Sequence, residues 1–253
     1  MGTVRAVLVL LPPSETKSTG GRGGPLDLDQ LWLPELTATR SALIDALVSL
    51  ADDVDASRSA LGLSPKQDDE IERNAALTVS PTRPALERYT GVLYDALDAA
   101  SFTRAQRARA QARLAIGSAL FGAVRAHDHV PAYRLSGGSA LPDLPTLRAL
   151  WKPQLPAAIS AAADGLVVDL RSGVYRDLGP VPGAITATVL TEQPDGSRTV
   201  VSHFIKHHKG LLARALTVTR AEPTTARAVA QVASKAGLRA EVASPTEVVV
   251  VTR

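Results

Sequence analysis

The chain has 253 residues, of which 45% are hydrophobic, and its formal net charge is +3. This composition is typical of a folded globular protein, and so small an excess of positive charge does not by itself indicate a nucleic-acid-binding protein. Because the chain contains no cysteine, disulfides, thiolate catalysis and cysteine-bound iron–sulfur clusters are excluded.

The first predicted element is a buried strand in the apolar run from Val4 to Leu11. The run is too short to span a membrane, and it ends in Pro12-Pro13 instead of the small residues of a signal-peptide cleavage site. We therefore expect a cytoplasmic protein with no membrane partner. The loop over residues 12–25 is rich in glycine and proline, and we expect its Lys17 to be well exposed.

Helices and strands then alternate along the chain without a strict βαβ repeat. Helical patterns occur at about 35–51, 65–77, 84–98, from 103 onwards, 145–163 and 223–236. Strand patterns occur at 166–170, 239–242 and 247–252, and in a hairpin whose strands, 184–191 and 198–206, flank a turn at 194–197. We expect residues 114–142 to be irregular and the arginines of the helix after Thr103 to face solvent.

The segment from Ser202 to Arg214 is the most distinctive part of the chain, because two lysines, three histidines and an arginine stand on an apolar frame. No carboxylate occurs between Arg198 and Arg220, whereas acidic residues gather in the first third of the chain. A stretch of unbalanced positive charge attracts anions. The hairpin places the start of this segment on a strand, and a helix follows from about Leu211.

The chain has nine aromatic residues, and most of them stand beside a glycine or a cation, as in Tyr133-Arg134 and Trp151-Lys152. A ring next to a cation suits stacking on a nucleobase together with contact to a phosphate. The same pattern arises when a ring fills the core and its neighbour faces solvent, so both interpretations stay open.

The histidines form two clusters, at 127 and 129 and at 203, 207 and 208, but neither has the spacing of a known metal motif. The chain also lacks a phosphate-binding P-loop, a dinucleotide-binding glycine pattern and a serine-hydrolase nucleophile elbow. We therefore expect neither a metal nor a cofactor.

Four segments together resemble the YaaA family of bacterial proteins. They are residues 10–17, 89–97, 116–135 and 202–214, and their order and separation fit nearly the whole chain. The third, which contains a glycine-rich string followed by Asp128, Pro131, Tyr133 and Arg134, is the most specific. Two positions depart from the family pattern, since Ala126 replaces a proline and Lys209 replaces an arginine, which keeps the charge but loses the bidentate fork.

The resemblance implies a single compact domain over residues 1–253 with a mixed α/β fold. In this fold a mixed sheet is flanked by helices, and a helix-hairpin-helix-like element is present. It also implies DNA binding in a basic cleft and a role in limiting damage from peroxide and free iron. The candidate for the helix-hairpin-helix is the pair of helices near 43–76, joined around Gly62. The histidines at 203, 207 and 208 match no family position.

Two functions remain in competition at this point. In the first, a DNA-binding stress protein contacts phosphates, largely without sequence preference, through Lys17, Arg134, Lys152, Lys206, Lys209 and Arg214. In the second, an enzyme acts on a small anionic or nucleotide-like substrate, with Lys17 or Lys206 as base or nucleophile and Arg134 as an anion clamp. A purely structural or partner-binding role explains the charge polarity but not the pairing of rings with cations. Convergence of the cations in a pocket favours a small molecule, and an open groove favours nucleic acid.

Overall fold

A mixed eight-stranded sheet flanked by helices forms the centre of the computed structural model, which describes residues 6–200 and 202–252. The expected α/β fold is therefore confirmed. The strands are β1 (Leu8–Leu11), β2 (Arg83–Pro84), β3 (Leu114–Ser118), β4 (Gly122–Arg125), β5 (His129–Val130), β6 (Val167–Asp169), β7 (Ile185–Glu192), β8 (Arg198–Thr199), β9 (Arg239–Ser244) and β10 (Glu247–Thr252). Val4, where the first strand was expected to begin, lies outside the described residues.

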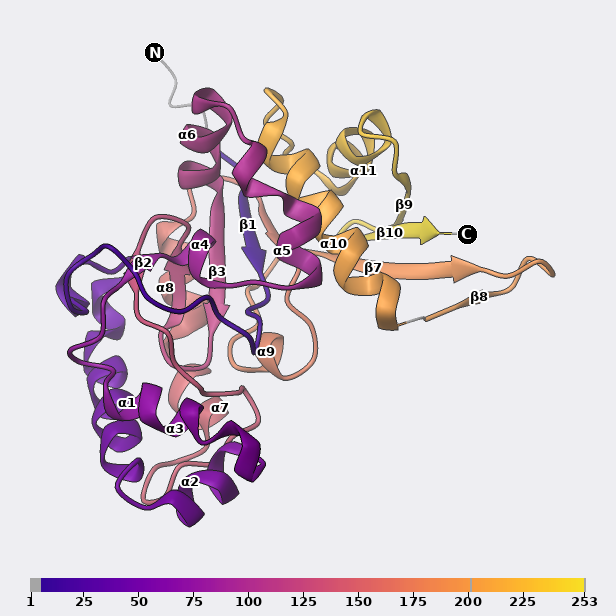
Figure 1. The fold of residues 1–253 in the computed structure, drawn as a ribbon. Coiled ribbons are helices and arrows are strands. Elements are labelled where there is room, and N and C mark those ends of the chain that lie inside the picture. Colours follow the sequence, from indigo (N-terminus) through magenta and orange to yellow (C-terminus); the bar gives the residue numbers. More distant parts are fainter. Residues whose placement is uncertain (1–5, 201, 253) are drawn as a thin grey trace.

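Eleven α-helices occur in the described part of the chain. They are α1 (Thr37–Leu50), α2 (Val54–Leu61), α3 (Asp69–Ala75), α4 (Ala85–Arg88), α5 (Val92–Leu97), α6 (Arg104–Arg113), α7 (Leu147–Trp151), α8 (Leu155–Ala162), α9 (Val174–Asp177), α10 (Ser202–Val218) and α11 (Ala226–Lys235). In Figure 1, α5 and α10 lie in front of the sheet, α8 lies behind it, and α1, α2, α3 and α7 gather beyond the ends of β1 and β3.

The strand order in the main sheet is β4-β3-β1-β6-β7-β10-β9, with β8 paired to β7. The five strands from β3 to β10 in this order run parallel, whereas β4 and β9 form antiparallel edges. The chain passes from β1 to β3 on one side and later returns to place β6 on the other side. Such a reversal opens a crevice at the carboxyl ends of the strands, which is where α/β proteins bind ligands.

Residues 114–142 are only partly the irregular region that the glycines suggested, because 131–142 lack helix or strand whereas 114–130 contain β3, β4 and β5. Residues 114–125 form the β3–β4 hairpin, because buried Leu114 and Ile116 pair with β1 in the middle of the sheet. The glycines serve packing instead. Gly122 has φ of +72°, and a Cβ there would lie 2.9 Å from the ring of Trp151.

The predicted hairpin after residue 184 is confirmed in its first strand, β7, but its second strand is limited to β8, which pairs with the end of β7. β8 ends at Thr199, and α10 begins at Ser202, so the expected strand over 198–206 is mostly helix. The apolar residues of α10 explain the difference, because Leu212 and Leu216 are completely buried. Packing of a whole helix outweighs the local strand preference of residues 200–205.

The expected helix at 84–98 is divided into α4 and α5 at Gly91, whose φ of +95° is unfavourable for other residues. Gly210 of α10 packs directly on α5. A Cβ at Gly210 would lie 2.3 Å from the carbonyl oxygen of Leu93, so only glycine fits this contact.

The arginines of α6 do not all face solvent. Arg113 is 2% exposed and donates to the carbonyl oxygens of Leu216 and Thr219, and Arg109 donates to that of Val218. The last carbonyl groups of a helix have no partner within it. Two arginines of α6 thus supply partners at the end of α10.

Candidate functional site

The strand-end site lies where β1, β3 and β6 finish, beside the reversal in strand order. Three segments reach it directly from these strands: residues 12–17 after β1, 118–121 after β3 and 169–171 at the end of β6. Figure 1 shows α9 next to this edge, with β1 and β3 pointing toward it. The fold therefore brings together segments that are far apart in the sequence.

Lys17 is buried, contrary to the expectation that its loop would expose it. It is 9% exposed, and its Nζ donates to the carbonyl oxygens of Ser14 and Glu15 at 3.2 and 3.3 Å. The same Nζ lies 4.1 Å from the ring centre of Tyr133 and 5.5 Å from that of Tyr89. Burial lowers the pKa of Lys17 to about 8.

A chain of hydroxyl groups runs beside Lys17. The hydroxyl of Tyr133 lies 2.7 Å from Ser118 Oγ and 2.8 Å from the hydroxyl of Tyr89. Ser118 Oγ already accepts the backbone N–H groups of Leu120 and Phe121, so it must donate to Tyr133, and Tyr133 must donate to Tyr89. The hydrogen of the Tyr89 hydroxyl has no acceptor among these three hydroxyl groups, so it is left to donate to another group. Burial raises the pKa of Tyr89 to about 12, so the group stays protonated.

Arg134 joins the site through Glu15. Its Nη1 lies 3.4 Å from Glu15 Oε2, while Tyr175 donates to Glu15 Oε1 at 2.8 Å. Asn74 fixes the backbone of Arg134 by bonding both its N–H and its carbonyl group at 2.8 Å. Within the described part of the chain, Arg134 Nε is buried without a hydrogen-bond partner. A buried donor of this kind is ready to bind an incoming acceptor.

A buried ion pair forms the floor of the site. Arg171 donates to both oxygens of Asp169 at 2.9 and 2.8 Å, and its side chain is 1% exposed. The side chain of Arg171 crosses to β3, since a Cβ on Gly117 would lie 2.6 Å from Arg171 Cδ. This contact ties the end of β6 to that of β3.

Lys209 of α10 approaches the same edge. Its Nζ donates to the carbonyl oxygen of Leu170 at 2.8 Å, and the residue is 5% exposed. Burial lowers the pKa of Lys209 to about 8, opposed by nearby Asp169 and reinforced by the positive charge of Arg176. Lys209 is therefore anchored at Leu170, between Asp169 and Arg171, and is within electrostatic range of the exposed Arg176 of α9.

The other predicted cations lie in different surroundings. Lys206 is exposed one helical turn before Lys209, so it extends the same side of α10 toward solvent. Lys152 is exposed directly after α7. Arg214 donates to the carbonyl oxygens of Leu97 and Asp98 and to Ser101 Oγ, which places it against the end of α5.

In the second histidine cluster, His203 and His207 both belong to α10, although the side chain of His203 lies outside the described residues. Among the residues that the structure describes, no three His, Cys, Asp or Glu side chains gather around a common point.

In the segment proposed as a helix-hairpin-helix, α2 ends at Gly62. Arg58 and Arg73 of this segment form ion pairs with neighbouring carboxylates.

The strand-end site offers an anion several donors and a hydroxyl chain in one place. The sequence predicted that Lys17, Arg134 and Lys209 are functional residues of this site. It gave no prediction for their partners Glu15, Asp169 and Arg171. The pattern Asp-x-Arg directly after an apolar strand was the available signal for the last two. No pattern indicated Asn74, because its partner Arg134 is 60 residues away.

None of the helices described here combines the length and the apolar character needed to cross a bilayer.

Comparison with known proteins places the whole chain in one group. The profile of the family described as peroxide stress protein YaaA matches residues 7–241. A UPF0246 protein of Corynebacterium efficiens is 52% identical over 240 residues, covering 93% of this chain and 95% of its own. UPF0246 proteins of Corynebacterium glutamicum and Streptomyces coelicolor are 48% and 42% identical, covering 93% and 95% of this chain and 95% and 94% of their own.

Proposed function

Because this chain belongs to the peroxide stress protein YaaA family, we propose that it limits damage from peroxide and free iron by binding DNA through backbone phosphates. The observation that carries the DNA proposal is the strand-end site. There, two buried lysines and Arg134, with its unpartnered Nε, lie near the carboxyl ends of the parallel strands. Together these cations suit a phosphate group.

The state of the two lysines supports anion binding. Burial lowers the pKa of Lys17 and Lys209 to about 8, because each ammonium group is poorly compensated by the protein. A bound phosphate supplies the missing negative charge and raises both pKa values. Anion binding then removes part of the electrostatic penalty that folding imposes on these lysines.

Exposed cations extend the site along the surface. Lys206 and His207 lie on the first two turns of α10, and Arg176 lies on α9 close to Lys209. Backbone phosphates follow one another along a strand, so a DNA ligand can contact the strand-end site and these exposed side chains together. This mode of contact is largely independent of base sequence.

The test is the salt dependence of binding to a fluorescently labelled DNA duplex, measured by anisotropy. Affinity should fall steeply between about 50 and 200 mM salt because binding releases counterions. Lys206→Gln should weaken binding and reduce the magnitude of the logarithmic salt slope by about one. The matched control is Lys235→Gln, the same exposed charge change on α11. Binding that is absent or insensitive to salt contradicts the proposal.

A second function is favoured by one specific observation, the buried amine of Lys17 beside the Tyr89–Tyr133–Ser118 hydroxyl chain. An amine with a pKa of about 8 has a substantial neutral fraction near neutral pH and is able to act as a base or nucleophile. In this alternative, the site is that of an enzyme for a small anionic substrate, and Arg134 clamps the anion.

The two functions are distinguished by treating the protein with a limiting amount of acetic anhydride, which acetylates lysine side chains. The acetylated lysines are then identified by mass spectrometry. The enzyme alternative predicts fast labelling of Lys17 at about pH 8, with protection by inorganic phosphate or a small carboxylate. The DNA proposal predicts that a duplex protects Lys17 at concentrations far below those at which inorganic phosphate protects it. If Lys17 is labelled more slowly than exposed Lys235, the enzyme alternative is wrong.

A further inference from the structure

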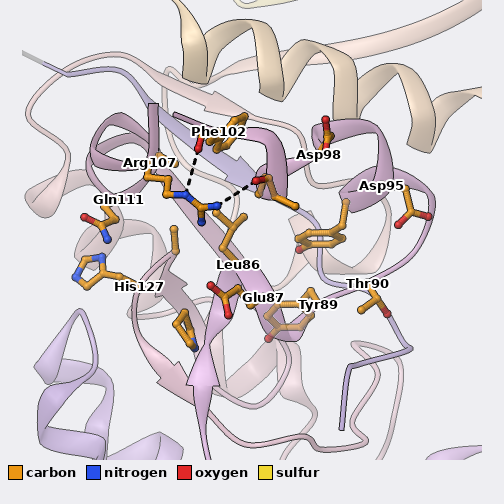
Figure 2. A pocket seen from close by; sticks show the side chains of 16 residues that line it. Leu86, Glu87, Tyr89, Thr90, Asp95, Asp98, Phe102, Arg107, Gln111 and His127 are labelled. Carbon is orange, nitrogen blue, oxygen red and sulfur yellow. Dashed lines mark hydrogen bonds between the residues drawn. The ribbon is translucent and has the colours of Figure 1, made fainter. Parts of the chain in front are cut away.

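A cavity lies between α4, α5 and α6 (Figure 2), and Tyr89 separates it from the strand-end site. Its volume is about 640 Å³, which is within the range of cavities that hold small organic ligands. The wall includes Leu86 and the rings of Tyr89, Tyr94 and Phe102. We call this cavity the ring chamber. It suits a flat, largely apolar group.

Acidic side chains stand around the ring chamber. Glu87, Asp95 and Asp98 are all exposed lining residues, and Figure 2 shows Glu87 beside Leu86 and Tyr89. Arg107 also lines the chamber, and its guanidinium donates to the carbonyl oxygens of Phe102 and Ala100 while the carboxylates at the rim have oxygens that can accept. The chamber therefore offers acceptors to the N–H and O–H groups of a ligand.

A cationic pocket adjoins the ring chamber. Its volume is about 440 Å³, and its lining includes Arg22, Arg83, Thr82 and His129. Two arginines and a histidine around one pocket favour an anionic group such as phosphate. We call it the arginine pocket.

The arginine pocket is built on a fixed loop. Gly23 exchanges backbone contacts with the start of β2, because its N–H donates to the Thr82 carbonyl oxygen while the Thr82 N–H donates to that of Gly24. A Cβ on Gly23 would lie 2.4 Å from Thr82 Oγ1 and 2.6 Å from His129 Nδ1, so glycine is required for this approach. The neighbouring Arg22 is held at the pocket by a defined backbone.

Pro84 and Glu87 line both cavities, so the ring chamber and the arginine pocket meet at a common wall. One end of the combined groove is apolar with acceptors at its rim, and the other end is cationic. A ligand that complements both ends carries a flat, hydrogen-bond-donating ring system and an anion.

We propose that this groove binds a nucleoside monophosphate, with the base in the ring chamber and the phosphate on Arg22 and Arg83. The sugar then lies at the shared wall, where its hydroxyl groups donate to the carboxylate of Glu87. Both arginines belong to the loop and strand that form the arginine pocket, not to the strand-end site. The two sites share Tyr89, but the phosphate contacts of this proposal are separate from those proposed for DNA.

The test is isothermal titration of the full chain with AMP, adenosine and inorganic phosphate. AMP should bind at least tenfold more tightly than either fragment, because only AMP fills both cavities. Arg22→Gln and Arg83→Gln should each weaken AMP binding about tenfold and leave adenosine binding unchanged. Ala100→Trp, a change at an exposed lining residue of the ring chamber, should block AMP and adenosine alike.

Arg104→Gln is the matched control, since it removes an exposed arginine of α6 that lines neither cavity. Arg22→Gln keeps the test meaningful if Arg83→Gln fails to fold, because Arg22 is exposed whereas Arg83 donates to Ser18 Oγ. The proposal is overturned if AMP does not bind at millimolar concentration. It is also overturned if Arg22→Gln and Ala100→Trp bind AMP as the unchanged chain does.

Discussion

The strand-end site and the arginine pocket both present cations, but they hold them in opposite ways. Lys17, Lys209 and Arg171 are buried and already bonded to carbonyl or carboxylate oxygens. Arg22 is exposed, and Arg83 is only partly buried. Burial with partners makes a charge important for stability as well as for binding a ligand, whereas a charge held at the surface acts mainly on a ligand.

Because of this difference, substitutions at the two sites should differ in how much they reduce the stability of the fold. Removing a partner at the strand-end site leaves a charge without compensation in a region of low dielectric constant. Removing an exposed arginine returns a surface position to water at little cost. Substitutions in the two places should therefore differ in what they damage, and the following predictions rank them by expected effect.

Asp169→Ala should have the largest effect, because it leaves the guanidinium of Arg171 buried without its carboxylate partner. We expect a loss of about 3–5 kcal/mol in the free energy of unfolding, measured by urea denaturation. Asp45→Ala, at an exposed position of α1, should lose far less. Equal losses for the two variants would mean that the ion pair is not part of the fold.

The pH dependence of stability tests the buried lysines. The pKa of Lys17 is about 8 in the folded chain against 10.5 for the ordinary side chain. Between these values the unfolded chain binds more protons than the folded chain, so this lysine makes stability rise with pH. From about pH 7.5 to 9.5 the gain should be roughly 2 kcal/mol, and Lys17→Met should abolish it.

Lys209→Met should remove a similar increment, since the pKa of Lys209 is also about 8. The upper limit near pH 9.5 matters because Tyr89, with a pKa raised to about 12, works in the opposite direction once the tyrosine of the unfolded chain ionises. If each variant shows the same pH dependence as the unchanged chain over this range, the lysines are not held in the poorly solvated state described here.

Arg214→Gln should have an intermediate effect. It removes bonds from α10 to Leu97 and Asp98 at the end of α5, in a partly exposed position. We expect a loss of about 1 kcal/mol in the free energy of unfolding, measured by urea denaturation. A loss of DNA affinity with unchanged stability would instead place Arg214 among the phosphate contacts.

Arg22→Gln should have the smallest effect on the fold. Because Arg22 is exposed, the free energy of unfolding should stay within about 0.5 kcal/mol of that of the unchanged chain. Urea denaturation of the same protein sample used for AMP titration provides the measurement. A larger loss would show that Arg22 stabilises its loop and would weaken the contrast with the strand-end site.

The sequence predicted the parts of the fold that depend on local patterns. The helix that became α1 and the strand β10 follow from local sequence patterns, and the α/β class follows from the resemblance to the family. The second strand of the hairpin failed, because the burial of Leu212 and Leu216 decides the helix from a distance. The β3–β4 hairpin was missed because its glycines serve contacts with Trp151 and Arg171 that no local pattern reveals.

The candidate site shows the same limit. Lys17 and Arg134 were identified from their motifs, yet the burial of Lys17 depends on the rings of Tyr89 and Tyr133, which come from distant segments. Arg214 belongs to the same basic stretch as Lys209, but its partner Leu97 is 117 residues away. The sequence therefore showed which cationic residues lie near one another along the chain. The tertiary structure determines which of them come together in space.

The most direct test of the proposed DNA contact compares Lys17→Met with Arg214→Gln by anisotropy on one labelled duplex, at about 50 and 200 mM salt. We predict that Lys17→Met binds at least about tenfold more weakly than the unchanged chain at low salt, whereas Arg214→Gln binds within about twofold of it. The folding of both variants is checked by urea denaturation. Unchanged affinity in Lys17→Met, or an equal loss in the two variants, would contradict the assignment of DNA binding to the strand-end site.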